Sequence, residues 1–407
     1  MHIHAPIVLE QGDRVRIEVP FKLAGHAGTL FRLWYELPAA YGMYIDEGRT
    51  DFAVLALLTV AMARGEDIRV AGRMSPRLLF GLRNHQHVFA SRFPALSRVS
   101  IESNALCERW QAPAGGTGTF FSGGVDSFYT LWTHRSSKES ISDYQITHAF
   151  YVEGFDSDLE APQAYQRTLV PYRRLLCEMG IALVPVRTNL KQFIPEGLWR
   201  PTFGRFLMSV AHLLSGLLNR VYIPSDKTYN DFLDVLSGTN PLTDHLCSTD
   251  SLQIIHDGAT VPRYKKVEAI ADWQPTYDHL FVCFVREGER AANCCRCEKC
   301  IRTMIALRLA GALDQYSTFP QPLTRRVIRR WRMPYYYISK YWARDMLQRA
   351  KREGHRALAW DLRWVVASHE VRNSRLGRWA RRVFVEPAKR IALLRKAHAA
   401  WRHWRAA

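Results

Sequence analysis

Strand-like and helix-like patterns alternate along the first 115 residues. Alternation of apolar and polar positions predicts four strands, at residues 14–21, 30–37, 67–72 and 97–103. Two longer apolar stretches predict helices at residues 51–65 and 75–93, the second with a proline at its start. We therefore expect an α/β or α+β N-terminal domain over residues 1–115, which ends in the glycine-rich loop 111–118.

The next 200 residues, 116–320, follow a more regular rhythm of apolar strands and helices. Strands are predicted at residues 118–121, 146–154, 181–189 and 220–226, and helices follow the first three of them. This rhythm predicts a doubly wound parallel sheet, in which ligands bind at the carboxyl ends of the strands. Those ends are Ser122–Ser127, Glu153–Asp158, Arg187–Leu190 and Ser225–Tyr229.

The distribution of charged residues separates residues 321–407 from the rest of the chain. Residues 321–407 contain 23 Lys and Arg against 5 Asp and Glu, whereas the remaining 320 residues contain 33 of each. We expect these last residues to form a basic helical extension whose partners differ from those of the rest of the chain. An N-terminus without a basic and apolar leader, together with apolar runs too short to span a bilayer, favours a soluble cytoplasmic protein.

The first strand end, Ser122–Ser127, has the composition of an anion-binding loop. Gly123 and Gly124 allow backbone N–H groups to approach an anion closely, and the positive end of the following helix points at the same place. Ser122 and Ser127 add hydroxyl donors. Asp126 fits beside a phosphate if it holds Mg²⁺ or orients the loop. A plain Ser/Gly-rich surface turn is the alternative.

The loop lacks the lysine of a Walker A motif and the spacing of GxGxxG. It resembles the SGGxDS signature of the PP-loop ATP pyrophosphatases, whose members cleave ATP between the α and β phosphates and transfer AMP to a substrate oxygen. The resemblance implies ATP and Mg²⁺ as ligands and a PP-loop fold for residues 116–320. It assigns nucleotide binding to a run of six residues, Ser122, Gly123, Gly124, Val125, Asp126 and Ser127.

A second motif is a cluster of cysteines. Cys283 precedes the heptapeptide CCRCEKC, which contains Cys294, Cys297 and Cys300 at x2 spacings. Four thiolates spaced in this way can close tetrahedrally on Zn²⁺, and we predict a zinc loop over residues 283–300. Cys295 competes with Cys294 as a ligand. An iron–sulfur cluster or plain reduced cysteines are the alternatives.

The cysteine spacing is similar to the zinc loop of the 7-cyano-7-deazaguanine synthase branch of PP-loop enzymes. The surrounding sequence is closer still to uncharacterised relatives of that branch, in which we expect glycine at the position of Cys295. The resemblance covers most of residues 50–315.

Four other polar residues are candidates for the same site. Arg263 and Lys266 are the cations best suited to clamp pyrophosphate, and Ser225 and Asp226 lie at a strand end beside the loop. Surface positions are the alternative for each of them.

Three further residues, Asp244, His256 and Asp257, fall in a polar connection of the kind that carries function. The superfamily resemblance implies that Glu153 contacts the adenosine half of the nucleotide, whereas a helix-capping carboxylate is its alternative.

Together these features predict an AMP- and pyrophosphate-forming ligase that adenylates a small-molecule carboxylate or amide and transfers nitrogen to it. An ATP-dependent sulfur transferase or tRNA-modifying enzyme, and a non-catalytic nucleotide sensor or scaffold, are the alternatives. The basic extension can bind RNA or an anionic membrane surface, or pack its apolar face on the body or on a second subunit of a homodimer.

Overall fold

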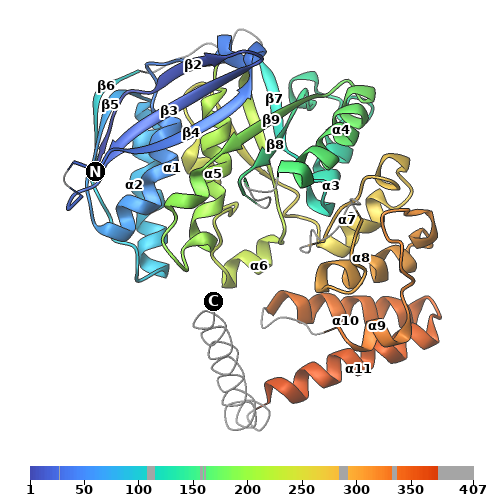
Figure 1. Cartoon of the computed structure of the whole chain (residues 1–407). Helices are drawn as coiled ribbons and strands as arrows, with labels where there is room; N and C mark the ends of the chain where they lie inside the picture. The colour runs from blue at the N-terminus through green and yellow to red at the C-terminus, as the bar shows by residue number, and fades with distance from the viewer. Residues whose placement is uncertain are drawn as a thin grey trace, which may run out of the picture. The chain divides into compact units, whose positions relative to one another are not determined.

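The computed structural model describes residues 1–26, 28–107, 115–155, 159, 162–283, 292–331 and 337–374 (Figure 1). The chain divides into two compact units, one of Met1–Asn293 with Asp314–Thr318 and one of Cys294–Leu313 with Phe319–Ala407. The first unit contains all the described strands, and the second contains only helices. We describe each unit by itself.

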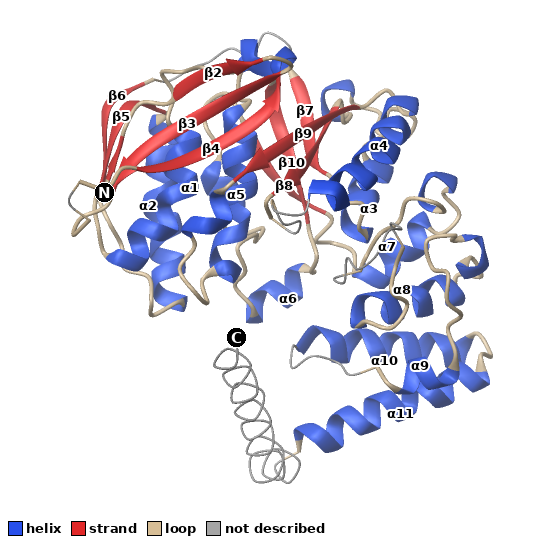
Figure 2. Ribbon diagram, viewed as in Figure 1, coloured by secondary structure: helices blue, strands red, loops and turns tan. Residues whose placement is uncertain are grey.

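The first unit is built on one sheet of eleven described strands (Figure 2). In chain order the strands are β1 His2–Ile3, β2 Ile7–Gln11, β3 Arg14–Lys22, β4 Phe31–Pro38, β5 Ile68–Met74, β6 Ile101–Leu106, β7 Gly116–Phe120, β8 His148–Glu153, β9 Ala182–Thr188, β10 Leu218–Pro224 and β11 Gln253–Asp257. The main helices are α1 Asp51–Arg64, α2 Pro76–Arg92, α3 Val125–Thr133, α4 Pro162–Glu178, α5 Trp199–Leu213, α6 Tyr229–Asp234 and α7 Arg263–Ile270.

Strands β9, β8, β7, β10 and β11 lie in that order and are all parallel. The chain moves outward from β7 through β8 to β9 and then returns to the other side of β7 with β10. Strand order therefore reverses at β7, and the carboxyl ends of β7 and β10 border the crevice where doubly wound sheets bind ligands. The predicted α/β class with a mostly parallel sheet flanked by helices is confirmed.

Apolar side chains point to both faces of the parallel strands, which explains why helices cover both faces of this sheet. Phe120 at the end of β7 belongs to the core formed with α1 and α5, whereas the next residue, Phe121, points the other way. The Phe121 ring packs edge-on against Phe128 of α3 and Tyr172 of α4, each with ring centroids 5.0 Å apart. Two hydrophobic layers thus enclose the parallel strands.

Helix α1 is strongly apolar and deeply buried, and its burial accounts for its long apolar run. Residues 51–62, almost the whole helix, are buried, because α1 packs against α5 on one side and the sheet on the other. No helix in the described part of the chain combines the length and the hydropathy needed to cross a bilayer.

One sheet contains strands from both sides of the predicted domain boundary at residue 115. Strands β4 and β9 pair antiparallel at two positions, Tyr35 with Thr188 and Glu36 with Arg187. Asn189 extends this short ladder, because its Oδ1 accepts from the Trp34 N–H over 2.9 Å and its Nδ2 donates to the Arg32 carbonyl over 2.9 Å. The first 106 residues therefore add their strands to the sheet that carries the crevice.

Three strands lie outside the sequence prediction. Strands β1 and β2 are short and pair with β3, and β11 occupies a segment that the sequence indicates to be a polar connection. The prediction for that connection was wrong in one respect, since His256 and Asp257 are the last two residues of β11. The strand predicted at 97–103 begins later, at Ile101.

The second unit contains α8 Glu298–Leu309, α9 Arg325–Arg329, α10 Tyr337–Arg352 and α11 Arg356–Asn373. Asp361 of α11 is buried and accepts from Arg325 Nε over 3.0 Å and Arg329 Nε over 2.6 Å, so two cations of α9 are neutralised inside the unit. The end of the predicted basic helical extension, residues 375–407, lies outside the described residues.

Replacing Asn189 by alanine should weaken the junction between β4 and β9. The change removes two hydrogen bonds and leaves a backbone N–H and a backbone carbonyl without these partners, which should lower the free energy of unfolding by about 2–4 kcal/mol. Urea unfolding measures the loss. Asn219→Ala, at a half-buried position on β10, is the control and should change stability little; equal losses in both variants would contradict a special role for Asn189.

Candidate functional site

The loop between β7 and α3 leaves no room for a side chain at Gly123. Gly123 has a φ of +73°, and a Cβ on it would lie 1.9 Å from Tyr172 Oη. Gly124 is the N-cap of α3, which begins at Val125. Gly123 therefore brings the backbone close to α4, and Gly124 lets α3 begin at the carboxyl end of β7.

The two serines hold this loop in shape. Ser127 Oγ donates to the Gly124 carbonyl over 3.0 Å and accepts from the Ser122 N–H over 3.3 Å. Ser122 Oγ accepts from the Gly124 N–H over 3.4 Å. On the other side, the Phe281 N–H donates to the Gly123 carbonyl over 2.7 Å. The loop is thus bound to the segment that leads to Cys283.

The three residues predicted to act on phosphates lie together. Asp126, in the first turn of α3, has Oδ2 at 2.8 Å from Arg263 Nη2 and Oδ1 at 3.7 Å from Lys266 Nζ. Both cations belong to α7, which packs against α3. Asp126 Oδ1 is buried and accepts no hydrogen bond from the described residues. A buried carboxylate oxygen without such a partner is suited to a cation or a donor of a bound ligand.

Lys266 is the most deeply buried cation of this group. Its side chain is 1% exposed, and Nζ donates to the Ser225 carbonyl over 2.5 Å. Burial lowers the pKa of Lys266, and the Asp126 carboxylate opposes that shift. Gly258 has a φ of +81°, and a Cβ there would lie 3.0 Å from Nζ. A glycine therefore makes room for the ammonium.

Ser225 is held by a buried histidine and carboxylate. His256 Nε2 lies 2.8 Å from Ser225 Oγ, and His256 Nδ1 lies 2.7 Å from Asp244 Oδ2. Ser225 Oγ also donates to the Lys227 carbonyl over 2.8 Å. Burial raises the pKa of Asp244, against the effect of the His256 hydrogen bond. Because the hydroxyl is committed to these partners, this chain of residues positions the Ser225 carbonyl that Lys266 binds.

Asp226 differs from its neighbour. Its side chain is 47% exposed, and its carboxylate receives two hydrogen bonds from Lys227 Nζ, at 2.6 and 2.7 Å. Desolvation acts to raise the pKa of Asp226, but the Lys227 charge and hydrogen bond outweigh it and lower the pKa. Asp226 therefore presents an ionised carboxylate at the carboxyl end of β10.

Glu153 ends β8 in a buried ladder of ion pairs. Glu153 Oε2 accepts from Arg187 Nε over 2.6 Å, and Arg187 Nη1 donates to Glu36 Oε2 over 3.0 Å. Burial raises the pKa of Glu153. Glu153 Oε1 is buried and accepts no hydrogen bond among the described residues. The structure therefore gives Glu153 a role between β8 and β9, and its predicted contact with adenosine stays a prediction.

Sequence reasoning missed one ionic pair beside the site. His134 Nε2 lies 3.0 Å from Asp257 Oδ1, and Thr130 Oγ1 donates to Asp257 Oδ2 over 2.6 Å. The His134 ring stacks on Tyr222 with ring centroids 4.1 Å apart. Burial acts to lower the pKa of His134, but the carboxylates of Asp257 and Glu139 outweigh it and raise the pKa. No sequence pattern links these residues, since α3, β10 and β11 bring them together.

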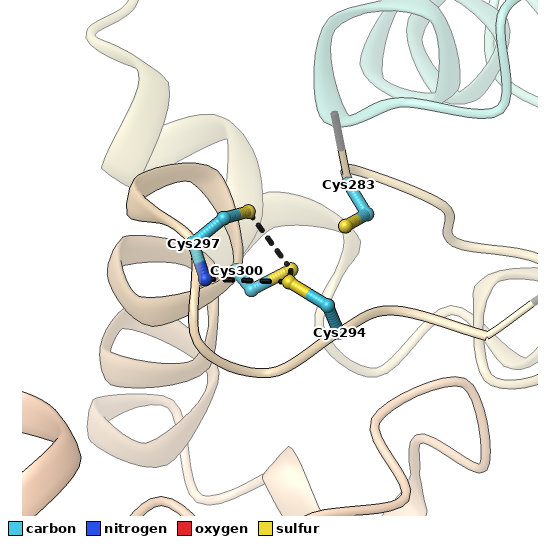
Figure 3. Close-up of side chains that lie close together, drawn as sticks. All are labelled: Cys283, Cys294, Cys297 and Cys300. Carbon is cyan, nitrogen blue, oxygen red and sulfur yellow. Dashed lines mark hydrogen bonds between the residues drawn. The ribbon is translucent and has the colours of Figure 1, made fainter. Parts of the chain in front are cut away.

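The four predicted cysteine ligands form one cluster (Figure 3). The Sγ atoms of Cys283, Cys294, Cys297 and Cys300 all lie within 4.8 Å of one another, and Cys300 Sγ is 3.4 Å from Cys297 Sγ and 3.9 Å from Cys294 Sγ. Tetrahedral zinc with Zn–S bonds of about 2.3 Å needs sulfur–sulfur distances of about 3.8 Å. The cluster therefore fits a metal ion such as zinc.

Local structure selects Cys294 over Cys295 as a member of this cluster. The Cys297 N–H donates to Cys294 Sγ over 3.3 Å, and Cys297 is the N-cap of α8, where the helix dipole favours thiolate. Cys295 lies outside the cluster and has a φ of +56°, the left-handed region that glycine adopts most easily.

Asn293 holds the backbone on both sides of the undescribed residues 284–291. Its Oδ1 accepts from the Val282 N–H over 2.8 Å, and its Nδ2 donates to the Leu280 carbonyl over 2.9 Å. The buried Asn293 side chain thus holds the backbone just before Cys283 next to the backbone just before Cys294.

Comparison with known proteins provides no relative, since no family model, no curated protein and no solved structure matches the chain. The resemblance of the glycine loop and the cysteine loop to the PP-loop enzymes therefore stays a prediction. What the chain can do has to be argued from the geometry of the site.

Cys297→Ser should release the metal, because it removes one of four thiolates. We expect the purified wild-type protein to hold about one equivalent of zinc, and the variant to hold well under half of that. Elemental analysis measures the content. Cys295→Gly is the matched control, which keeps all four ligands and relieves the left-handed backbone, so its zinc content should be that of the wild type. Equal zinc contents in Cys297→Ser and wild type would remove this site.

The His134–Asp257 pair should make stability depend on pH. The raised pKa of His134 stabilises the fold fully below the unfolded value, 6.5, and this contribution is lost as pH rises through the folded pKa. The lowered pKa of Asp257 stabilises the fold above 3.8, and that contribution is lost on acidification. The pair is therefore strongest between these two values.

His134→Gln keeps a polar side chain but removes the charge. At about pH 5.5 it should cost about 1–2 kcal/mol of unfolding free energy, and the cost should shrink at about pH 9. Denaturant titrations at both pH values measure the difference, with His87→Gln, an exposed change on α2, as the control. A cost that does not vary with pH would show that the charge of His134 contributes nothing.

Proposed function

We propose that this protein is an ATP-dependent, AMP- and pyrophosphate-forming enzyme of the PP-loop type. The observation that carries the proposal is the position of Ser122–Ser127. This loop follows β7 at the reversal of strand order and begins a helix whose first turn faces Arg263 and Lys266. A glycine loop, a helix N-terminus and two cations at one strand end together suit the phosphates of a nucleotide.

The charges of the site support pyrophosphate as its ligand. Arg263 offers a planar guanidinium that can bind two phosphate oxygens, and Lys266 supplies a compact ammonium from a dry position. In the structure Asp126 neutralises both cations. Phosphate oxygens can take over the two cations and leave the Asp126 carboxylate available to Mg²⁺. The oxygen of Asp126 that accepts no hydrogen bond from described residues suits that exchange.

The chemistry follows from these positions. Mg²⁺, when bound by Asp126, would neutralise charge that develops on the departing pyrophosphate. The loop N–H groups, Arg263 and Lys266 orient the phosphates so that a substrate oxygen meets the α-phosphorus. The adenylated carboxylate or amide then carries AMP as its leaving group, and an amine or ammonia displaces it. Positioning and electrostatics are the whole contribution of the protein to this reaction type.

We further propose that the cysteine cluster holds zinc in a structural role. Four thiolates make a closed tetrahedral set that leaves no position for substrate, which is typical of structural zinc. Cys283 lies two residues after Phe281, whose N–H binds the Gly123 carbonyl. Metal held by Cys283 would thus fix the segment that supports the nucleotide loop.

Product analysis tests the proposed reaction. The protein is incubated with Mg-ATP, ammonium and a metabolite extract, and AMP and pyrophosphate should accumulate. Asp126→Ala should lower the rate by about 10²–10³-fold, because a preorganised group on developing charge is lost. Asp272→Ala, an exposed acid just after α7, is the control and should retain the wild-type rate.

Other products would change the proposal in defined ways. ADP and phosphate would contradict α–β cleavage. ATP binding without turnover in all extracts would favour a nucleotide sensor, and turnover that requires added RNA or a sulfur donor would favour the tRNA-modifying or sulfur-transfer alternative.

A further inference from the structure

Helix α11 carries an apolar stripe on its exposed face. Trp360 is 60% exposed, Trp364 58% and Val371 69%, and the exposed Ala367 lies between the last two. Spacings of four, three and four residues place all of them on one side of the helix. Most of the opposite side is buried in the helical unit, including Leu362 and Val365. We call Trp360, Trp364, Ala367 and Val371 the tryptophan stripe.

A cationic cavity adjoins the first residue of the stripe. It has a volume of about 260 Å³ and is lined by residues at the end of α10, the turn after it and the start of α11. Trp360 and three cations, Lys351, Arg356 and Arg363, line it together with small residues. No carboxylate lines the cavity, and none of these three cations forms an ion pair with a residue that the structure describes.

Two of the cations that line the cavity lie beside the tryptophan stripe. Arg356 and Arg363 precede Trp360 by four residues and follow it by three, so both lie along one flank of the stripe. Both acids of α11 are paired elsewhere, since Asp361 is buried and binds Arg325 and Arg329, and Glu370 pairs with Arg344. The stripe runs from Trp360 to Val371, or about 16 Å along the helix. An elongated apolar strip, bordered by cations that form no ion pair with described residues, is typical of a helix that lies in the plane of a membrane.

We propose that this face of α11 docks on the surface of a bilayer that contains anionic lipids. Indole rings prefer the boundary between headgroups and acyl chains, and Trp360 and Trp364 would enter there with Val371. The cavity formed by Lys351, Arg356 and Arg363 would receive the phosphate or carboxylate of a headgroup. The excess of 23 Lys and Arg over 5 Asp and Glu in residues 321–407 adds long-range attraction to the same surface.

The composition of the stripe favours a lipid surface over single-stranded RNA. Bases stack on aromatic rings, whereas Ala367 and Val371 form the second half of the stripe and offer no π face. Aliphatic side chains that continue a line of tryptophans increase the area available to acyl chains. This proposal stands independently of the proposed enzymatic reaction.

Vesicle flotation of the full chain tests the proposal. The protein should float with vesicles of phosphatidylcholine and phosphatidylserine, float poorly with phosphatidylcholine alone, and be released by salt. Trp360→Ala/Trp364→Ala and Arg356→Glu/Arg363→Glu should each weaken binding by about tenfold or more. All four positions are exposed, and circular dichroism checks that both variants fold.

Matched controls separate this face from general attraction. Phe80→Ala removes an equally exposed aromatic ring from α2, and Arg326→Glu/Arg330→Glu makes the same charge change on α9 and its C-cap. Both controls should bind vesicles within about twofold of wild type. Three results would overturn the proposal: no flotation of wild type, equal losses in controls and test variants, or test variants that bind as wild type does. RNA that competes fully with vesicles while binding more tightly would assign the surface to nucleic acid instead.

Discussion

The buried ammonium of Lys266 is the constraint around which the site is arranged. An ion removed from water needs compensating charge and hydrogen bonds, and Lys266 donates a hydrogen bond to the Ser225 carbonyl. Asp126 supplies the nearest opposite charge, and Asp257 at the end of β11 adds to it. Asp244 and His256 hold Ser225 in turn. Asp126 thus compensates the Lys266 charge at ion-pair distance, 3.7 Å, whereas the hydrogen bond of the ammonium goes to a backbone carbonyl.

Patterns within short segments made most of the fold predictable. β3, β4, β8, β9 and β10 coincide closely with runs of alternating or apolar residues, and α1 with a long apolar run, because burial of one or both faces leaves that signature. β1, β2 and β11 carry no such signature, since they are short or half polar. The pairing of β4 with β9 depends on contacts such as Asn189 with Trp34, 155 residues apart, and no local pattern records that separation.

The same distinction applies to the candidate site. The residues of the glycine loop lie close together in sequence, and so do those of the cysteine cluster. Their spacing alone therefore predicts an anion-binding loop and a metal site. Local geometry then explains details, such as the left-handed Cys295, that spacing leaves open. His134 with Asp257, and Ser225 with His256 and Asp244, become partners only because the fold brings the end of α3, the end of β10, the end of β11 and the segment before β11 together. Isolated polar residues of this kind are identified by the topology alone.

The antiparallel junction between β4 and β9 has a consequence for dissection of the chain. A fragment that begins at residue 116 would keep the glycine loop and the crevice but would leave β9 as an open edge, with Val184 and Val186 stripped of part of their cover. Bare edges of this kind recruit other strands, so such a fragment would self-associate when expressed alone. The N-terminal strands thus cover the β9 edge of the half that carries the glycine loop, and they protect that edge against aggregation.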